Sequence, residues 1–215
     1  MENRQGEGVD LSNLGNCYQR LGDVARAIHY GERALSIARE TGYRRGESHR
    51  LHNLAMAYVD DGQAARGREY AEQALTIARR LGDRELQGYA LKAVGLARVA
   101  LGEVPEGLAC YEQALTIARK AQDPRLEGET LGQRGEAHAA LGDAGQAAED
   151  HAQALAIWQR LGDRLMAARQ RELLGRALGE QGDMAGAREQ LAGALALYKA
   201  MGLSTAAGRQ QTLKE

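Results

Sequence analysis

One eight-residue segment, EQALTIAR, occurs twice without a change, at residues 72–79 and 112–119. Related segments begin at residues 32, 152 and 192, so five copies follow one another at a constant spacing of forty residues. A fixed period of this length is the sequence signature of a solenoid, in which each unit buries its apolar face by stacking on its neighbours. The period therefore predicts one elongated repeat domain that extends over residues 1–215.

A second marker precedes the first within each unit and begins with Leu11-x-x-Leu14-Gly15-x-x-Tyr18. Apolar residues three and four apart predict a helix, so each unit is expected to be a pair of helices. The fold class predicted is all-α. The expected first helices cover 8–21, 46–61, 85–101, 125–141 and 165–181, and the expected second helices cover 24–41, 64–81, 104–121, 144–161 and 184–201.

Glycine and aspartate mark the turns between these helices. A glycine ends the first helix of every unit, at positions 22, 62, 102, 142 and 182, and suits the left-handed residue that closes a helix. The second turn carries glycine at 42, 82, 162 and 202, and Gln122-Asp123-Pro124 where the glycine is missing. Aspartate is a good helix N-cap, and it is expected in that role at Asp23, Asp83, Asp123, Asp143, Asp163 and Asp183.

The ends of the array differ from its middle. The five repeats are expected at 8–43, 44–83, 84–123, 124–163 and 164–203. Residues 204–215 fall where another first helix would begin, but Gln211 and Lys214 stand where most copies have Leu or Val, so this segment is predicted to be a polar capping helix. At the amino terminus the stacking face is expected to be open, as in a piece of a longer protein.

Charge and hydropathy restrict the partners. The 28 basic and 29 acidic residues leave a formal net charge of −1, which gives no general attraction to nucleic acid or to an anionic membrane. No stretch approaches the ~20 apolar residues of a membrane span, and residues 1–6 lack an apolar signal core. We expect a cytoplasmic protein that binds neither nucleic acid nor membrane.

The two cysteines are expected to be reduced. Cys17 and Cys110 lie more than two repeats apart, and the repeats of a solenoid contact only their neighbours. Alanine occupies the position of Cys17 in every other unit, so Cys17 is predicted to be a small buried residue.

The residues that recur at equivalent positions of the five repeats resemble those of tetratricopeptide repeats. The resemblance rests on the leucines, the Leu-Gly pair, the tyrosine, the glycine turn and an alanine late in each second helix, at positions 34, 74, 114, 154 and 194. It covers nearly the whole chain and implies a right-handed superhelical solenoid. The forty-residue unit resembles the long variety in kinesin light chains, G-protein-regulator scaffolds and bacterial regulatory proteins. HEAT-type repeats share this period but lack the small-residue pattern.

Arg134 stands at a position that is apolar in the other repeats. Asp150, in the same repeat, stands at a position that is uncharged in the others. An unpaired buried charge is costly, so the two side chains are predicted to form an ion pair. The alternative is that Arg134 binds an anion in the groove.

No catalytic or metal site can be assembled from the sequence. His49 and His52 are three residues apart on a predicted helix, but a third ligand is not evident. Phosphate loops, nucleophile elbows and paired-carboxylate sites are also not evident. We therefore expect a protein that is not an enzyme and that uses no cofactor and no metal.

The resemblance implies that the first helices line an inner groove and that their variable positions contact the ligand. Asparagine amides at Asn13, Asn16 and Asn53 resemble those that hold a peptide main chain in related repeats, and Tyr89, Met56 and Leu96 would accept apolar side chains. The basic positions of the carboxylate-clamp variety are not matched. The complete predicted peptide-binding set is Asn13, Asn16, Arg20, His49, His52, Asn53, Met56, Tyr89, Lys92, Leu96, Gln133, Glu136, Arg169 and Arg176.

The function predicted is a protein–protein interaction scaffold whose groove takes a peptide or helix of a partner. One alternative is a sensory or autoinhibitory repeat region of a larger bacterial regulator linked to transcription or to an ATPase. The other is an enzyme or metal protein, which analysis of bound metal would test.

Overall fold

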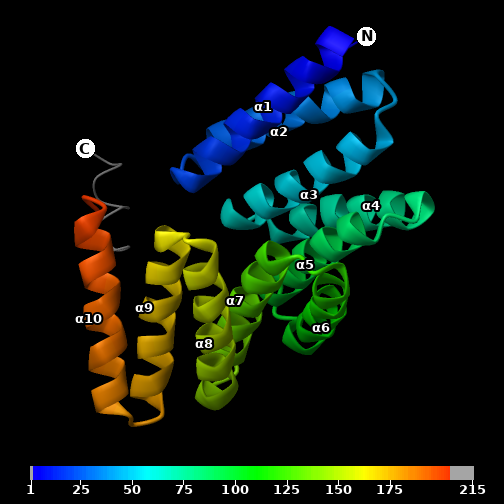
Figure 1. The fold of residues 1–215 in the computed structure, drawn as a ribbon. Helices are drawn as coiled ribbons and strands as arrows, with labels where there is room; N and C mark the ends of the chain where they lie inside the picture. Colours follow the sequence, from blue (N-terminus) through cyan, green and yellow to red (C-terminus); the bar gives the residue numbers. More distant parts are fainter. Residues whose placement is uncertain (1, 204–215) are drawn as a thin grey trace. The chain divides into compact units, whose positions relative to one another are not determined.

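The computed structural model describes residues 2–203 of the chain, and these residues form ten α-helices and no β-strand. Within residues 2–121 and within residues 122–203, successive helices run antiparallel and are joined by tight turns (Figure 1). The predicted all-α repeat solenoid is confirmed, whereas its right-handed path stays a prediction. The helices are α1 (Glu2–Arg20), α2 (Val24–Glu40), α3 (Arg44–Asp60), α4 (Ala64–Leu81), α5 (Arg84–Ala100), α6 (Val104–Ala121), α7 (Pro124–Ala140), α8 (Ala144–Leu161), α9 (Arg164–Glu180) and α10 (Met184–Ala200).

Nine helices agree with the predicted bounds to within two residues, but α1 begins six residues earlier than predicted. The polar composition of residues 2–7 concealed this turn and a half of helix. Arg4 stabilises it by pairing with Glu7 one turn away at 2.6 Å and with Glu40 of α2 at 3.1 Å. Gly8 lies against Ile37 of α2, where an added Cβ would come within 2.9 Å of the isoleucine. A polar amino-terminal segment is thus held on α2 by one ion pair and by close packing.

The turns follow the predicted chemistry. The predicted turn glycines have positive φ, from 66° at Gly42 to 86° at Gly182, and Gln122 takes φ of 54° where the glycine is missing. All six predicted aspartate caps accept a backbone N–H of the first helical turn; Asp143, for example, accepts the N–H of Gln146 at 3.1 Å. Local sequence therefore decides where each helix starts and stops.

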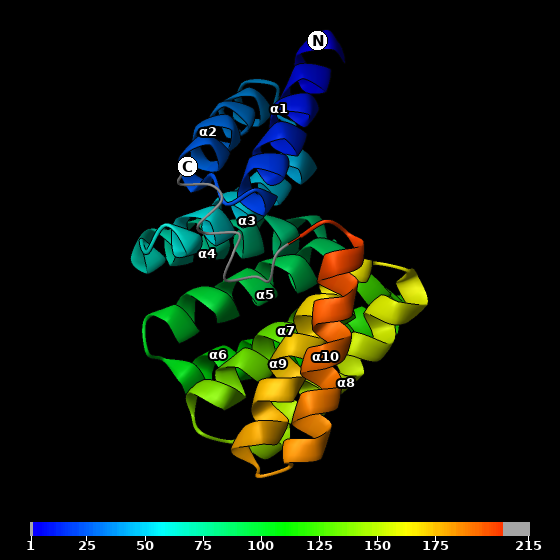
Figure 2. The same cartoon turned by 90° about the vertical axis from the view of Figure 1, so that its left-hand side faces the viewer.

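The contacts of the chain group it into two compact units, residues 1–121 and 122–215. Unit one contains α1 to α6, and unit two contains α7 to α10, in which α9 and α10 lie side by side (Figure 2). The single domain expected from the sequence stays a prediction. Unit one has a core of leucine, alanine and tyrosine that includes Leu54, Tyr58, Ala74 and Ala114. In unit two, Tyr198 packs with Ala168 and Ala194.

The first helices of unit one approach one another more closely than the second helices do. α3 packs against α5 and touches α1, whereas contact of this extent is not formed between α2 and α4 or between α4 and α6. Helices that approach more closely lie on the inner side of a curved stack. The surface formed by α1, α3 and α5, called the first-helix surface below, is the inner face of unit one.

Cys17 differs from its prediction. It is exposed on α1, although the alanine at the same position of each later repeat is buried. α2 covers α3, α4 covers α5 and α8 covers α9, whereas α1 has only α2 and α3 packed on it in the described structure. Both cysteines are free, as predicted.

Two further expectations concern the capping helix and membrane spans. The predicted capping helix, residues 204–215, lies outside the described residues. Within residues 2–203, none of the helices is both long enough and apolar enough to cross a membrane.

Candidate functional site

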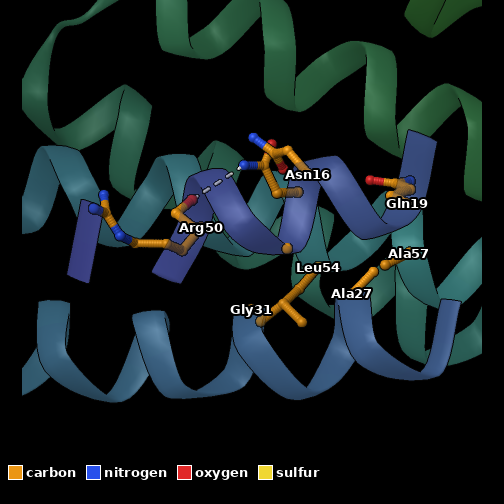
Figure 3. A pocket seen from close by; sticks show the side chains of 10 residues that line it. Asn16, Gln19, Ala27, Gly31, Arg50, Leu54 and Ala57 are labelled. Carbon is orange, nitrogen blue, oxygen red and sulfur yellow. Dashed lines mark hydrogen bonds between the residues drawn. The ribbon is translucent and has the colours of Figure 1, made fainter. Parts of the chain in front are cut away.

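A narrow crevice opens on the first-helix surface between α1, α2 and α3 (Figure 3). Its cavity volume of 10 Å³ is about the space of one water molecule. Asn16 reaches it from α1 and Asn53 from α3, and the Asn53 amide donates to Ser12 Oγ at 3.5 Å. Two half-buried amides thus lie at one place on facing helices. The lining residues are Ser12, Gly15, Asn16, Gln19, Ala27, Gly31, Arg50, Asn53, Leu54 and Ala57.

Aromatic and basic side chains gather further along the same surface. The rings of His52 and Tyr89 meet edge to face with centroids 5.5 Å apart, and the ring of His49 lies 6.0 Å from that of His52. Lys92 Nζ lies 5.3 Å from the centre of the Tyr89 ring. The Tyr89 ring therefore connects α3 and α5 and presents a half-buried apolar surface beside them.

The surroundings lower the pKa of both histidines. Removal of water lowers the pKa of His52 well below its ordinary value, and the charges of Lys92 and His49 act in the same direction. The pKa of His49 is also lowered, first by desolvation and then by Arg50, Arg45 and Lys92. Both shifts favour the uncharged imidazole beside Tyr89, which makes this part of the surface less polar than its composition indicates.

The structure places ten of the predicted binding residues in unit one, at different depths. Asn13, Arg20 and His49 are exposed. His52 and Lys92 are 7% and 1% exposed, so they support the surface from below and offer a ligand little side-chain area. The half-buried members are Asn16, Asn53, Met56, Tyr89 and Leu96.

The other four predicted residues belong to unit two and make contacts of their own there. Arg169 of α9 donates to Glu136 of α7 at 2.9 Å, and Arg176 pairs with Glu172 on the same helix. Gln133 is half-buried, and its side-chain oxygen has no hydrogen-bond partner in the described chain. Three of these four predicted residues are thus engaged in ion pairs within unit two.

The predicted binding set lacks eight of the ten residues that line the crevice, and three of the eight have polar side chains. Ser12 is buried, and Gln19 donates to Asp60 at 2.7 Å. Arg50 is 5% exposed and donates to the carbonyl of Gly46 at 3.0 Å; its guanidinium points away from Asn16 (Figure 3). The sequence offered a signal for Arg50: it is a charged residue at a position where the three later repeats have Ala, Thr and Gln.

A metal site does not follow from the two histidines. Among residues 2–203, no group of three or more His, Cys, Asp or Glu side chains is arranged to hold a metal ion. What the surface offers is amide hydrogen bonding next to apolar area.

The repeat pattern also identifies the family. The tetratricopeptide repeat model matches residues 9–80 and 47–120, which together cover more than half of the chain. The chain belongs to the tetratricopeptide repeat family. The match includes α2 to α5 in full and most of α1 and α6, so the first-helix surface of unit one from residue 9 onward lies in recognised tetratricopeptide repeats. No curated protein sequence gave a significant match.

Several solved tetratricopeptide structures are similar in fold. A putative kinesin light chain from Podosopora anserina, with nearly identical TPR-like repeats, is 23% identical with a TM-score of 0.63, and the match covers 95% of this chain and 100% of that one. BtubC (BKLC) from P. vanneervenii is 21% identical with a TM-score of 0.73, covering 93% and 82%. A Rap protein complexed with competence and sporulation factor is 17% identical with a TM-score of 0.82, covering 90% and 54%.

These matches support the long-repeat variety that resembles kinesin light chain. The tetratricopeptide repeat is a protein-interaction fold and is typically a non-enzymatic scaffold.

Proposed function

We propose that unit one binds an extended segment of a partner protein on its first-helix surface. The observation that carries the proposal is the position of Asn16 and Asn53, two half-buried amides on facing helices that line one crevice. A side-chain amide both donates and accepts, so it can pair with a peptide main chain irrespective of the peptide's sequence.

Apolar area next to the amides would give the interaction its selectivity. Met56 is half-buried against the core of unit one, and Tyr89 and Leu96 are half-buried on α5. Side chains that are partly exposed and firmly packed lose little freedom when a ligand covers them. The partner segment is therefore expected to carry apolar side chains beside an extended main chain.

The test compares the parent chain with the double variant Asn16→Ala, Asn53→Ala in a pull-down, followed by affinity measurement on the protein that is selectively lost. Each amide hydrogen bond contributes on the order of 0.5–1.5 kcal/mol, so binding should weaken about fivefold to a hundredfold. Circular dichroism of the double variant should match that of the parent.

A charge reversal on a second helix is the matched control. Glu72 is exposed on α4, away from the first-helix surface, and Glu72→Arg should leave binding intact. Should the partner bind the asparagine double variant normally and lose affinity for Glu72→Arg, the outer surface is the binding surface and the proposal fails.

A second candidate is the ligand-sensing region of a larger regulator. The similarity to a Rap protein complexed with competence and sporulation factor favours it, and the match covers 54% of that protein. In that case the binding of a short peptide to unit one should change the affinity of the full gene product for a second macromolecule, and an unchanged affinity would count against this function.

A further inference from the structure

An open pocket of 460 Å³ lies in unit two, between α8, α9 and α10. Its volume is within the range of pockets that hold small molecules. The pocket is separate from the crevice of unit one and uses none of the predicted binding residues. It is lined by Trp158, Gln159, Gly162, Asp163, Arg164, Ala167, Arg171, Gly193, Ala196 and Leu197.

The equivalent place in unit one contains a buried carboxylate. Glu47 is 5% exposed; its two oxygens pair with Arg44 Nη1 at 2.7 Å and with Arg39 Nε at 3.1 Å. Arg39 also donates to Gln73 of α4 at 3.2 Å. The cluster is satisfied within the chain, because two guanidiniums compensate the buried negative charge.

Three periods later, the same positions line the pocket without that carboxylate. Residues 120 positions on from Arg39, Arg44, Glu47 and Gln73 are Gln159, Arg164, Ala167 and Gly193, and all four line the pocket. One arginine is retained, while the glutamate becomes alanine and the glutamine of the second helix becomes glycine. The pocket therefore lies where the glutamate and glutamine side chains of unit one would be.

Arg164 has lost its intramolecular partner. The other arginines at this repeat position pair with the residue three positions on, Arg4 with Glu7 at 2.6 Å and Arg84 with Gln87 at 3.3 Å, as Arg44 does with Glu47. Ala167 takes the partner's place, and within the described chain Arg164 has no side-chain hydrogen bond or ion pair.

A second cation has been added to the lining. Arg171 stands where the other repeats have leucine. Its side chain is half-buried, and its Nη1 donates to Gln190 at 3.0 Å. An added Cβ at Gly193 would come within 2.7 Å of this Nη1, so glycine there leaves room for the guanidinium. The acidic lining residue, Asp163, accepts the N–H of Met166 as the cap of α9. The pocket thus combines two guanidiniums with a carboxylate already engaged in capping.

The rest of the lining is apolar. Trp158 is fully buried at a position where the earlier repeats have alanine, and its indole Nε1 has no hydrogen-bond partner in the described chain. Ala196 and Leu197 of α10 form the opposite wall. An aromatic or aliphatic group would displace water from Ala196 and Leu197 favourably.

We propose that this pocket binds a small organic acid, whose carboxylate takes the place of the Glu47 carboxylate of unit one and whose apolar body lies against Trp158 and Leu197. Arg164 and Arg171 would hold the carboxylate, and Gln159 would supply a neutral donor in place of Arg39. The room left by Ala167 and Gly193 sets the size of the ligand.

Trp158 is the single tryptophan of the chain and lines the pocket, so its fluorescence reports occupancy. Phenylacetate is the probe, and phenylacetamide is a control of the same shape without the charge. We expect a saturable change with phenylacetate, weakened by salt, and an affinity for phenylacetamide at least about tenfold lower, because charge-assisted hydrogen bonds are the stronger ones. A blocked Leu-Glu-Leu peptide tests the other source of a carboxylate; if it binds and phenylacetate does not, the small-acid proposal is overturned.

Two substitutions test the site itself. Ala167→Glu restores the internal carboxylate and should abolish phenylacetate binding, and Arg164→Gln should weaken it at least about threefold. Arg84→Gln, at the equivalent position of unit one, is the matched control and should bind as the parent does. Circular dichroism checks folding, and Arg164→Gln keeps the test valid if Ala167→Glu fails to fold. Equal affinity for the acid and the amide, unchanged binding by both pocket variants, or no saturable change up to the solubility of phenylacetate would each overturn the proposal.

Discussion

The guanidinium of Arg134 on α7 makes two hydrogen bonds to the carboxylate of Asp150 on α8, from Nε at 2.9 Å and from Nη2 at 2.6 Å. The side chains are 13% and 2% exposed, so this is a buried two-pronged ion pair within one repeat. His138 Nε2 lies 3.9 Å from the same carboxylate. The predicted pairing is confirmed, and the anion that the alternative required for Arg134 is supplied by the chain itself.

Arg134→Leu should destabilise the protein by about 3–5 kcal/mol, because it leaves the Asp150 carboxylate buried without its main partner. Asp150→Tyr strands the arginine and should also destabilise. The double variant places Leu and Tyr where Leu54 and Tyr70 occur in the second repeat, and it should recover part of the loss. Urea unfolding of the three variants gives the coupling free energy, expected at about 1–3 kcal/mol. Strictly additive effects would mean that the two residues are not coupled.

Ala114→Leu should destabilise the protein by about 1–3 kcal/mol. Ala114 is 0% exposed in the core of unit one, where helices approach closely and three extra carbon atoms have no free space. Gln113→Leu adds an apolar side chain at the exposed neighbouring position and should change the free energy of unfolding by less than about 0.5 kcal/mol. Chemical denaturation compares the two variants, and equal effects would contradict this packing of α6.

Stability should fall as the pH is lowered below about 6.5, the ordinary pKa of histidine. Burial lowers the pKa of His52 in the folded state, so at acidic pH the unfolded chain binds a proton that the folded chain does not. His49 and His151 are shifted in the same direction. Each such histidine can contribute a slope of up to about 1.4 kcal/mol per pH unit between its folded and unfolded pKa values.

The measurement is the free energy of unfolding between pH 7 and pH 5 for the parent and for His52→Leu. The variant should lose one histidine's share of the slope, whereas Gln113→Leu, which changes no titratable group, should retain the parent's slope. A His52→Leu slope equal to that of the parent would show that His52 titrates alike in both states.

Much of the fold could be predicted because its determinants are local or periodic. A glycine at each turn and an aspartate at each helix start act within a few residues, and the caps at Asp23 and Asp143 form as expected. The forty-residue period predicts which helices pack together, since each unit stacks on its neighbours. Even the Arg134–Asp150 contact could be predicted, because both are charged residues at otherwise uncharged positions of one repeat.

The candidate sites depended on contacts that the repeat pattern does not encode. The variable columns identified the helices of the binding surface, but they could not show that Lys92 and His52 would be buried beside Tyr89. Cys17 shares its column with buried alanines and is nevertheless exposed, because burial depends on what packs against a helix and not on its own sequence.

The sequence by itself thus determined the helices, their turns and the order in which they stack, because capping and periodic apolar contacts act over short distances along the chain. The tertiary structure decided how deeply each polar side chain lies, which amides meet at the crevice of unit one, and where Arg164 is left without a carboxylate such as the one that Arg44 has in Glu47. Those outcomes depend on the volumes of side chains from three helices at once, and packing of that kind exists only after the chain has folded.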